Sequence, residues 1–136
     1  MYDRRDFFKT TTAAAASILV AGSAIPAFAT DAAMFTNIVY TKENPGKWDK
    51  KVWSHAPQVS VKGSTVVVTT RHSMSNAHFI VRHTLILKDG TYLGATTFSP
   101  KDKPESSYEL PAGYKGKIFV TSFCNKHDFW LTETIV

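Results

Sequence analysis

The segment FIVRHTLILKDGTYLGATTF, residues 79–98, decides the fold class of this chain. Residues 79–88 alternate in the manner of a strand with one buried face, because successive side chains of a strand point to opposite sides. Asp89-Gly90 is a strong signal for a tight turn, which leads into a second strand over 91–98. We therefore predict an antiparallel hairpin. We expect the face of its first strand that carries Phe79, Val81, His83, Leu85 and Leu87 to lie on the core, and the other face carries Ile80, Arg82, Thr84, Ile86 and Lys88.

Short strand-like runs continue on both sides of this hairpin, separated by turn formers. Residues 31–51 contain Asn44-Pro45-Gly46, and we predict an irregular arm here with one short strand at 37–40. No amphipathic helix pattern follows the arm. Such spacing is typical of two packed sheets, so we predict an all-β, immunoglobulin-like antiparallel β-sandwich of about seven strands. The other predicted strands are 58–61, 65–70, 108–110, 117–123 and 129–136, with a polar loop over 99–107.

Residues 1–29 have the features of an export signal. Arg4-Arg5 precede a weakly apolar, alanine-rich run over 12–26, and Ala27-Phe28-Ala29 fits an A-x-A cleavage site. The run is shorter than the roughly 20 apolar residues of a spanning helix, which argues against a membrane anchor. We predict a twin-arginine signal peptide over 1–29, folded transport by the twin-arginine translocase, a periplasmic location and a single domain over 30–136.

The composition excludes some kinds of partner. The chain has 16 Lys and Arg against 11 Asp and Glu, a net charge of +5 at pH 7. No Lys/Arg-rich run is interleaved with aromatic residues, so we predict no binding to nucleic acid. Because Cys124 is the only cysteine, the chain cannot form an internal disulfide. The thiol is therefore buried and inert, paired with another chain, or bound to a metal.

Cys124 and His127 have a C-x2-H spacing that lets one sulfur and one imidazole nitrogen reach a single metal ion. Three more histidines fall on predicted loops. His55 precedes the first confident strand, and His72 and His78 lie between two strands. The Ser and Asn residues between His72 and His78 favour a loop that folds back, which can bring both rings to one ion.

His83 differs from these four histidines because it lies in mid-strand, among apolar residues. We interpret it as structural, with its ring nitrogens bonded to buried partners. A single exposed histidine is ordinary, so only the combination of the other four with Cys124 indicates a site.

The combination resembles the iron domain of the superoxide reductases, the neelaredoxin and desulfoferrodoxin family. The likeness covers about residues 47–135 and rests on His55, on H-x5-H at His72 and His78, and on C-N-x-H at Cys124 and His127 followed by Trp130. It implies one iron ion per chain on an immunoglobulin-like sandwich. The four histidines would be equatorial ligands, and Cys124 would be the axial ligand opposite an open position.

The resemblance also implies an enzyme that reduces superoxide by one electron to hydrogen peroxide while Fe(II) becomes Fe(III). The chain has no second cysteine cluster for a rubredoxin-like centre, so an external redox protein must supply the electrons. One-iron members of the family are often homotetramers, which makes a homotetramer an expectation here. Iron loading before export would avoid competition from copper and zinc, which bind imidazole and thiolate more tightly.

The sequence departs from the family pattern at two places. The family commonly has Glu-Lys before its first histidine, where this chain has Trp53-Ser54, and glycine after its last histidine, where this chain has Asp128. The family glutamate can cap ferric iron, and the lysine helps to attract superoxide. Lys47, Lys50 and Lys51 lie just upstream of His55 and could replace that charge, or they form an ordinary solvated cluster.

Two other functions fit parts of the pattern. A blue-copper protein would also be a β-sandwich with cysteine and histidine in one loop, but no methionine follows His127, and Met74 lies in another loop. A periplasmic iron or copper electron carrier without efficient superoxide turnover is the alternative function. A thiol carrier would use Cys124 as a covalent handle, a role that favours a mobile cysteine flanked by glycine.

Overall fold

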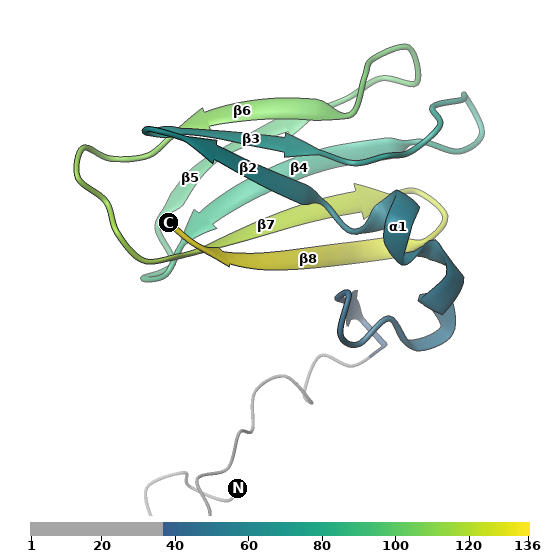
Figure 1. Ribbon diagram of the computed structural model, residues 1–136. Helices are drawn as coiled ribbons and strands as arrows, with labels where there is room; N and C mark the ends of the chain where they lie inside the picture. The colour runs from purple at the N-terminus through teal and green to yellow at the C-terminus, as the bar shows by residue number, and fades with distance from the viewer. Residues whose placement is uncertain (1–36) are drawn as a thin grey trace, which may run out of the picture.

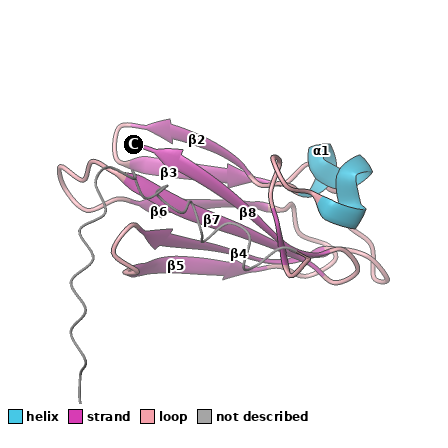
Figure 2. Cartoon of the chain, turned by 90° about the horizontal axis from the view of Figure 1, so that it is seen from below, coloured by secondary structure: helices cyan, strands magenta, loops and turns pink. Residues whose placement is uncertain are grey.

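The computed structural model describes residues 37–136, and the predicted signal peptide over 1–29 lies outside this part of the chain. The described residues form two sheets, with two short helical segments at one end (Figures 1 and 2). The predicted all-β fold is confirmed. The elements are β1 (Val39–Tyr40), η2 (Gly46–Lys51), α1 (Val52–His55), β2 (Gln58–Lys62), β3 (Thr65–Thr69), β4 (Ile80–Leu87), β5 (Tyr92–Thr97), β6 (Glu105–Glu109), β7 (Lys117–Cys124) and β8 (Asp128–Ile135).

The two sheets pack face to face around an apolar core. The larger sheet has the strand order β1-β8-β7-β4-β5, and the smaller has β2-β3-β6. Strands β3 and β7 alternate between buried and half-buried side chains, as expected for strands with one face on the core. The main cluster of buried side chains comes from both sheets: Val66, Val68, Leu85, Leu87, Tyr108, Leu110, Ile118 and Val120.

The alternation predicted for β4 is broken by a bulge near its start. The pairing with β7 shifts between Ile80 and Arg82, and such a bulge changes which side chains face inward. Ile80 is fully buried, so the prediction that Phe79 and Val81 face the core was wrong. Ile80 instead pairs with Cys124 and belongs to the same buried cluster. Beyond the bulge the prediction is confirmed for His83, Leu85 and Leu87.

His83 has the structural role that its position predicts. Its ring is buried, with Nδ1 2.9 Å from Ser106 Oγ and Nε2 2.8 Å from Thr70 Oγ1. Burial lowers the pKa of His83 to about 4, so the imidazole is neutral at pH 7. Strand β6 begins at 105 rather than at the predicted 108, where Glu105 pairs with Thr69, and its polar Ser106 faces inward to His83. A hydrophobic pattern cannot predict such a strand.

The predicted irregular arm contains helical turns. Segment η2 is a 3-10 helix, α1 follows it directly, and the strand predicted over 37–40 is reduced to β1, which pairs with β8 in parallel. The backbone N–H of Ala56 donates to the carbonyl of Val52, and Pro57 then ends the helix. His55 is therefore the last residue of a helix instead of a loop residue. No helix among residues 37–136 is long and apolar enough to span a membrane.

Candidate metal centre

Five side chains with metal-binding atoms meet at the end of the sandwich where α1 lies beside the β7–β8 turn (Figure 1). Their ligand atoms all lie within 4.8 Å of one another. They come from the end of α1, the loop between β3 and β4, the end of β7 and the turn after it. The fold thus brings together the five predicted site residues: His55, His72, His78, Cys124 and His127.

The four imidazoles form a ring. Nδ1 of His127 is 2.9 Å from Nε2 of His55 and 3.0 Å from Nε2 of His78, and the latter atom is 3.0 Å from Nε2 of His72. Neighbouring ring centroids are 4.4 to 4.7 Å apart on all four sides, including the side between His55 and His72. Across the ring, the centroids of His55 and His78 are 5.9 Å apart. The order around the ring is therefore 55, 127, 78, 72.

The size of this ring fits one metal ion. A square with edges of 3.0 Å has its centre about 2.1 Å from each corner, which is the usual distance from a metal to an imidazole nitrogen. The sulfur of Cys124 lies 3.6 Å from Nδ1 of His127 and 3.8 Å from Nε2 of His72, so it can reach the same ion. Imidazole and thiolate donors together suit iron, copper or zinc.

The loop that carries His72 and His78 folds back as predicted. Ser75 and His78 form a bridge with two backbone hydrogen bonds of 3.0 and 3.1 Å. Asn125, in the turn after β7, holds the end of this loop: its Nδ2 donates to the Ala77 carbonyl at 3.1 Å, and its Oδ1 accepts the N–H of Phe79 at 3.0 Å. One asparagine thus connects the loop of two ligands to the turn of the other two.

His55 is oriented by its own helix. Its Nδ1 lies 3.2 Å from the carbonyl oxygen of Lys51 and 2.8 Å from Oγ of Ser54. A proton on Nδ1 can be donated to these acceptors, which leaves the lone pair of Nε2 for a metal. Ser54, which stands where the family has lysine, therefore supports the ligand beside it.

Cys124 is the last residue of β7, where it is 1% exposed, and so it is a strand residue rather than the loop residue we predicted. Burial raises the pKa of the Cys124 thiol, and hydrogen bonding from the backbone N–H groups of Lys126 and His127 opposes that increase. The indole N–H of Trp130 donates to the carbonyl of His127 at 2.9 Å and ties the turn to the core. The sulfur is thus held by the backbone of the turn that also carries His127.

Burial sets the protonation of the site. It is the main cause that lowers the pKa of all four histidines of the ring, that of His55 to about 3. The positive charge of Lys51 lowers the pKa further at His72, His78 and His127. Burial raises the pKa of the Cys124 thiol. At neutral pH the imidazoles are therefore in the form that binds metal, whereas the thiol must first lose a proton.

Metal binding should therefore tighten as the pH rises. From pH 7 to 8 the thiol is the one ligand that must still release a proton, so the apparent affinity should increase about tenfold over that unit. Competition titrations with a chelator at several pH values, together with proton release in weak buffer, measure this effect. A flat profile would show that Cys124 does not bind the metal as thiolate.

Asn125→Ala should weaken metal binding without removing a ligand. It deletes two hydrogen bonds that join the ligand-bearing segments, and supporting changes of this kind cost about 10–100-fold in metal affinity. Because Asn125 is exposed, we expect a loss near tenfold. The matched control is Asn76→Ala, an exposed asparagine of the His72–His78 loop, which should leave the affinity within twofold. Equal losses in both variants would contradict the proposed connection.

Trp48 and Asp128 lie beside the candidate ligands. The sequence indicated Asp128 as unusual but gave no reason to expect Trp48 at the site. The Trp48 ring meets the His127 ring edge to face at 4.6 Å, and its Nε1 donates to Asp128 Oδ2 at 3.2 Å. Lys47 lies 3.7 Å from the same carboxylate. Because the family has glycine at this position, Asp128 could be recognised from the sequence as a departure. Nothing in the sequence indicated that Trp48 is its partner.

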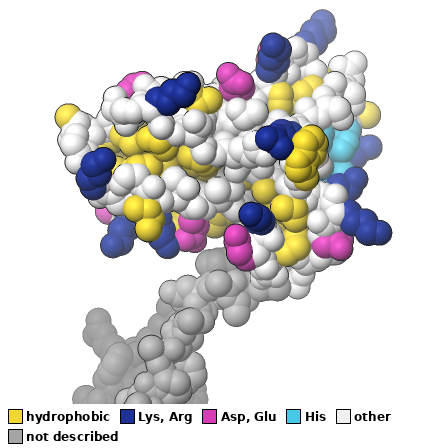
Figure 3. All heavy atoms as spheres, in the orientation of Figure 1, with side chains coloured by type: hydrophobic (Ala, Val, Ile, Leu, Met, Phe, Trp, Pro, Cys, Tyr) yellow, Lys and Arg dark blue, Asp and Glu magenta, His cyan; other side chains and the backbone are white. Residues whose placement is uncertain are grey.

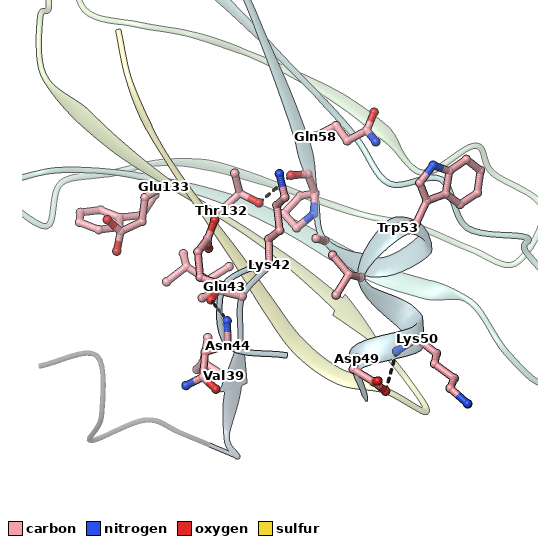
Figure 4. A pocket seen from close by; sticks show the side chains of 16 residues that line it. Val39, Lys42, Glu43, Asn44, Asp49, Lys50, Trp53, Gln58, Thr132 and Glu133 are labelled. Carbon is pink, nitrogen blue, oxygen red and sulfur yellow. Dashed lines mark hydrogen bonds between the residues drawn. The ribbon is translucent and has the colours of Figure 1, made fainter. Parts of the chain in front are cut away.

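Trp53, at the position of the family glutamate, is 67% exposed, and the Arg71 guanidinium lies over its ring at 5.0 Å. A groove of about 1160 Å³ lies between α1 and β8, and Phe119 and Leu131 are among the residues that line it. Figure 4 shows Trp53 projecting from α1 among its labelled lining residues. None of the five candidate ligands lines this groove. In Figure 3 histidine side chains reach the surface at the α1 end, next to Lys and Arg side chains.

Fold and site together describe a two-sheet β protein with a candidate centre for a single metal ion. The family model of desulfoferrodoxin matches residues 47–133, so the chain belongs to the desulfoferrodoxin family. This confirms the family that the histidine and cysteine pattern resembled. The comparison with curated proteins gave no match.

Several solved structures share the fold. A variant of the superoxide reductase (neelaredoxin) from Ignicoccus hospitalis is 24% identical, with a TM-score of 0.65 and coverage of 75% of this chain and 95% of the other. The one-iron superoxide reductase from Giardia intestinalis is 22% identical, with a TM-score of 0.55 and coverage of 61% and 98%. The superoxide reductase from Treponema pallidum is 26% identical, with a TM-score of 0.50 and coverage of 59% and 66%.

Proposed function

We propose that this protein is a superoxide reductase, an enzyme that combines superoxide with one electron and two protons to form hydrogen peroxide. The observation that carries the proposal is the convergence of five ligand atoms within 4.8 Å in a member of the desulfoferrodoxin family. The four nitrogens and one sulfur are the donor set that the resemblance to the superoxide reductases implies for a single iron ion.

The five side chains have separate tasks in this proposal. His55, His72, His78 and His127 would hold one iron ion through imidazole nitrogens, and Cys124 would hold it through its sulfur. When bound, iron supplies the single electron by passing from Fe(II) to Fe(III). The Cys124 thiolate adds electron density, which favours this step, and the N–H groups of Lys126 and His127 moderate it by bonding to the sulfur.

Two positive side chains near the ring favour the approach of an anion. Burial is the main cause of the lowered pKa of His72, His78 and His127, and the positive charge of the half-buried Lys51 lowers all three further. The charge of Lys126 also lowers the pKa of His78 and His127. Lys47 is instead engaged with Asp128. Lys51 is therefore a lysine upstream of His55 that we expect to attract superoxide.

Trp53 cannot supply a carboxylate where the family glutamate caps ferric iron. We expect the oxidised protein to hold iron without a protein carboxylate among its ligands. Vibrational spectroscopy of the oxidised protein with labelled carboxylates tests this expectation, and a bound carboxylate would contradict it.

Continuous turnover requires an external electron donor. The test is to generate superoxide enzymatically and to follow its removal by the purified protein, with and without a chemical reductant. A reductase removes superoxide catalytically only while electrons are supplied, whereas removal that is independent of the reductant would indicate dismutation instead.

Metal analysis after anaerobic purification separates this proposal from the alternative electron carrier. One iron per chain supports a superoxide reductase, provided that superoxide then oxidises the iron. Copper with an intense blue colour in the oxidised state would support a blue-copper carrier. Iron that superoxide does not oxidise would leave an iron protein without the proposed turnover.

We also propose that residues 1–29 direct export of the folded protein to the periplasm by the twin-arginine translocase. The support is Arg4-Arg5 with the alanine-rich run and the Ala27-Phe28-Ala29 site. Replacing both arginines by lysine should hold the precursor in the cytoplasm, and unchanged export would contradict the proposal. The domain over 30–136 and a homotetramer remain predictions, which mass spectrometry and light scattering of the mature protein can check.

A further inference from the structure

Asp128 occupies an unusual backbone position beside the candidate ligands. It follows His127 directly and pairs with Cys124 across the β7–β8 hairpin. Its φ is 65°, in the left-handed region that glycine and asparagine adopt most readily and that most other residues adopt only at a cost in free energy. The backbone alone would favour glycine here, so the side chain of Asp128 invites an explanation.

The carboxylate of Asp128 is held in place by residues of the N-terminal arm. Trp48 donates its indole N–H to Oδ2 at 3.2 Å, across 80 residues of sequence. The Lys47 ammonium lies 3.7 Å from the same oxygen and 4.8 Å from the centre of the Trp48 ring. The ion pair is solvent-exposed and adds little by itself. The indole bond, together with the contact of Trp48 with His127, fixes the carboxylate beside the ligand turn.

The Asp128 carboxylate is fixed next to two of the candidate ligands. Asp128 follows His127 directly in the sequence and pairs with Cys124 across the hairpin. Trp48 donates to the carboxylate and also contacts the His127 ring. An ion bound between Cys124 and His127 would lie in the field of this negative charge.

We propose that the Asp128 carboxylate, fixed by Trp48 and Lys47, lowers the reduction potential of the metal ion that Cys124 and His127 bind. A nearby negative charge stabilises Fe(III) more than Fe(II), because the ferric ion carries one more positive charge. The inference rests on the iron centre of the proposed function. Asp128 is not one of the five side chains whose ligand atoms converge, so it would tune the centre from beside its ligands.

The test is a redox titration of the iron-loaded protein and its Asp128→Asn variant. Asparagine tolerates the left-handed backbone and keeps an oxygen that can accept the Trp48 N–H, so the change removes the charge alone. We expect a higher potential, such that the ratio of oxidised to reduced iron at the wild-type midpoint falls about tenfold, which is 59 mV for one electron. Asp128→Gly, which also removes the charge and suits the backbone, should shift the potential in the same direction.

The matched control is Asp49→Asn, which removes the same charge from an exposed aspartate of η2. Asp49 accepts the N–H of Lys50 and is not bonded to the ligand turn. In this variant we expect the ratio of oxidised to reduced iron at the wild-type midpoint to change less than twofold. An unchanged or lower potential in Asp128→Asn, or an equal increase in Asp49→Asn, would overturn the inference.

The outcomes distinguish this inference from the proposed function. A shifted potential in a protein that does not reduce superoxide would support the role of Asp128 and contradict the function. If the protein reduces superoxide but Asp128→Asn leaves the potential unchanged, the proposed function is supported and the role of Asp128 is contradicted. A protein that binds no iron would overturn both.

Discussion

Cys124→Ser should nearly abolish superoxide reduction while the protein still folds. Serine fits the space of the buried cysteine, but its oxygen donates far less electron density to a metal than a thiolate does. We expect the rate of superoxide reduction to fall by about 100-fold or more, beyond the 10–100-fold typical of changes in the supporting residues. Rapid mixing of the reduced variant with superoxide measures this rate.

Spectroscopy provides the accompanying control. Absorption that arises from sulfur-to-iron charge transfer should disappear in oxidised Cys124→Ser. It should persist in Asn125→Ala, which retains the sulfur and loses only supporting bonds. A Cys124→Ser protein that keeps this absorption, or that reduces superoxide at the wild-type rate, would show that the sulfur is not a ligand.

His78→Ala should remove most of the metal. The Nε2 atom of His78 lies 3.0 Å from the ligand atoms of both His72 and His127, so its loss opens one corner of the ring. His78 is only half-buried, and its removal should leave the two sheets intact. We expect an iron content below about a tenth of that of the wild type, since the remaining ligands leave an incomplete site.

Thermal unfolding gives a second measurement of the same change. A metal present at a hundred times its dissociation constant stabilises the fold by about 2.7 kcal/mol, which raises the Tm of a domain of this size by about 10 °C or more. Adding a chelator should therefore lower the Tm of the wild type and of Asn76→Ala by that amount, and that of His78→Ala by less than about 2 °C. Equal chelator effects on all three proteins would contradict a ligand role for His78.

The fold could be predicted from the sequence wherever a strand has one apolar face. Strands β3, β4 and β7 satisfy this condition, and β5 was predicted from the Asp89-Gly90 turn that precedes it. Strand β6 does not, because Ser106 faces inward and forms a hydrogen bond with His83. A polar residue on the core face interrupts the apolar pattern and makes the segment resemble a loop. The bulge at the start of β4 was also unpredictable, since it depends on the pairing with β7 rather than on local sequence.

The candidate ligands could be predicted because the chain has one cysteine and five histidines, and the four histidines that meet Cys124 all lie outside the strands. Their supporting contacts could not. The bond between Trp48 and Asp128 spans 80 residues, and only the folded arm brings the two together. The role of Ser54 likewise depends on α1, a helix of four residues that the sequence did not predict.

The most direct test of the account is the yield of hydrogen peroxide when the anaerobic Fe(II) protein receives superoxide. The protein is given in excess, oxygen and peroxide are both measured, and His78→Ala provides the background. We predict one peroxide formed and one iron oxidised for each superoxide consumed, without oxygen release. One peroxide and one oxygen from every two superoxide ions, with the iron still reduced at the end, would contradict the account.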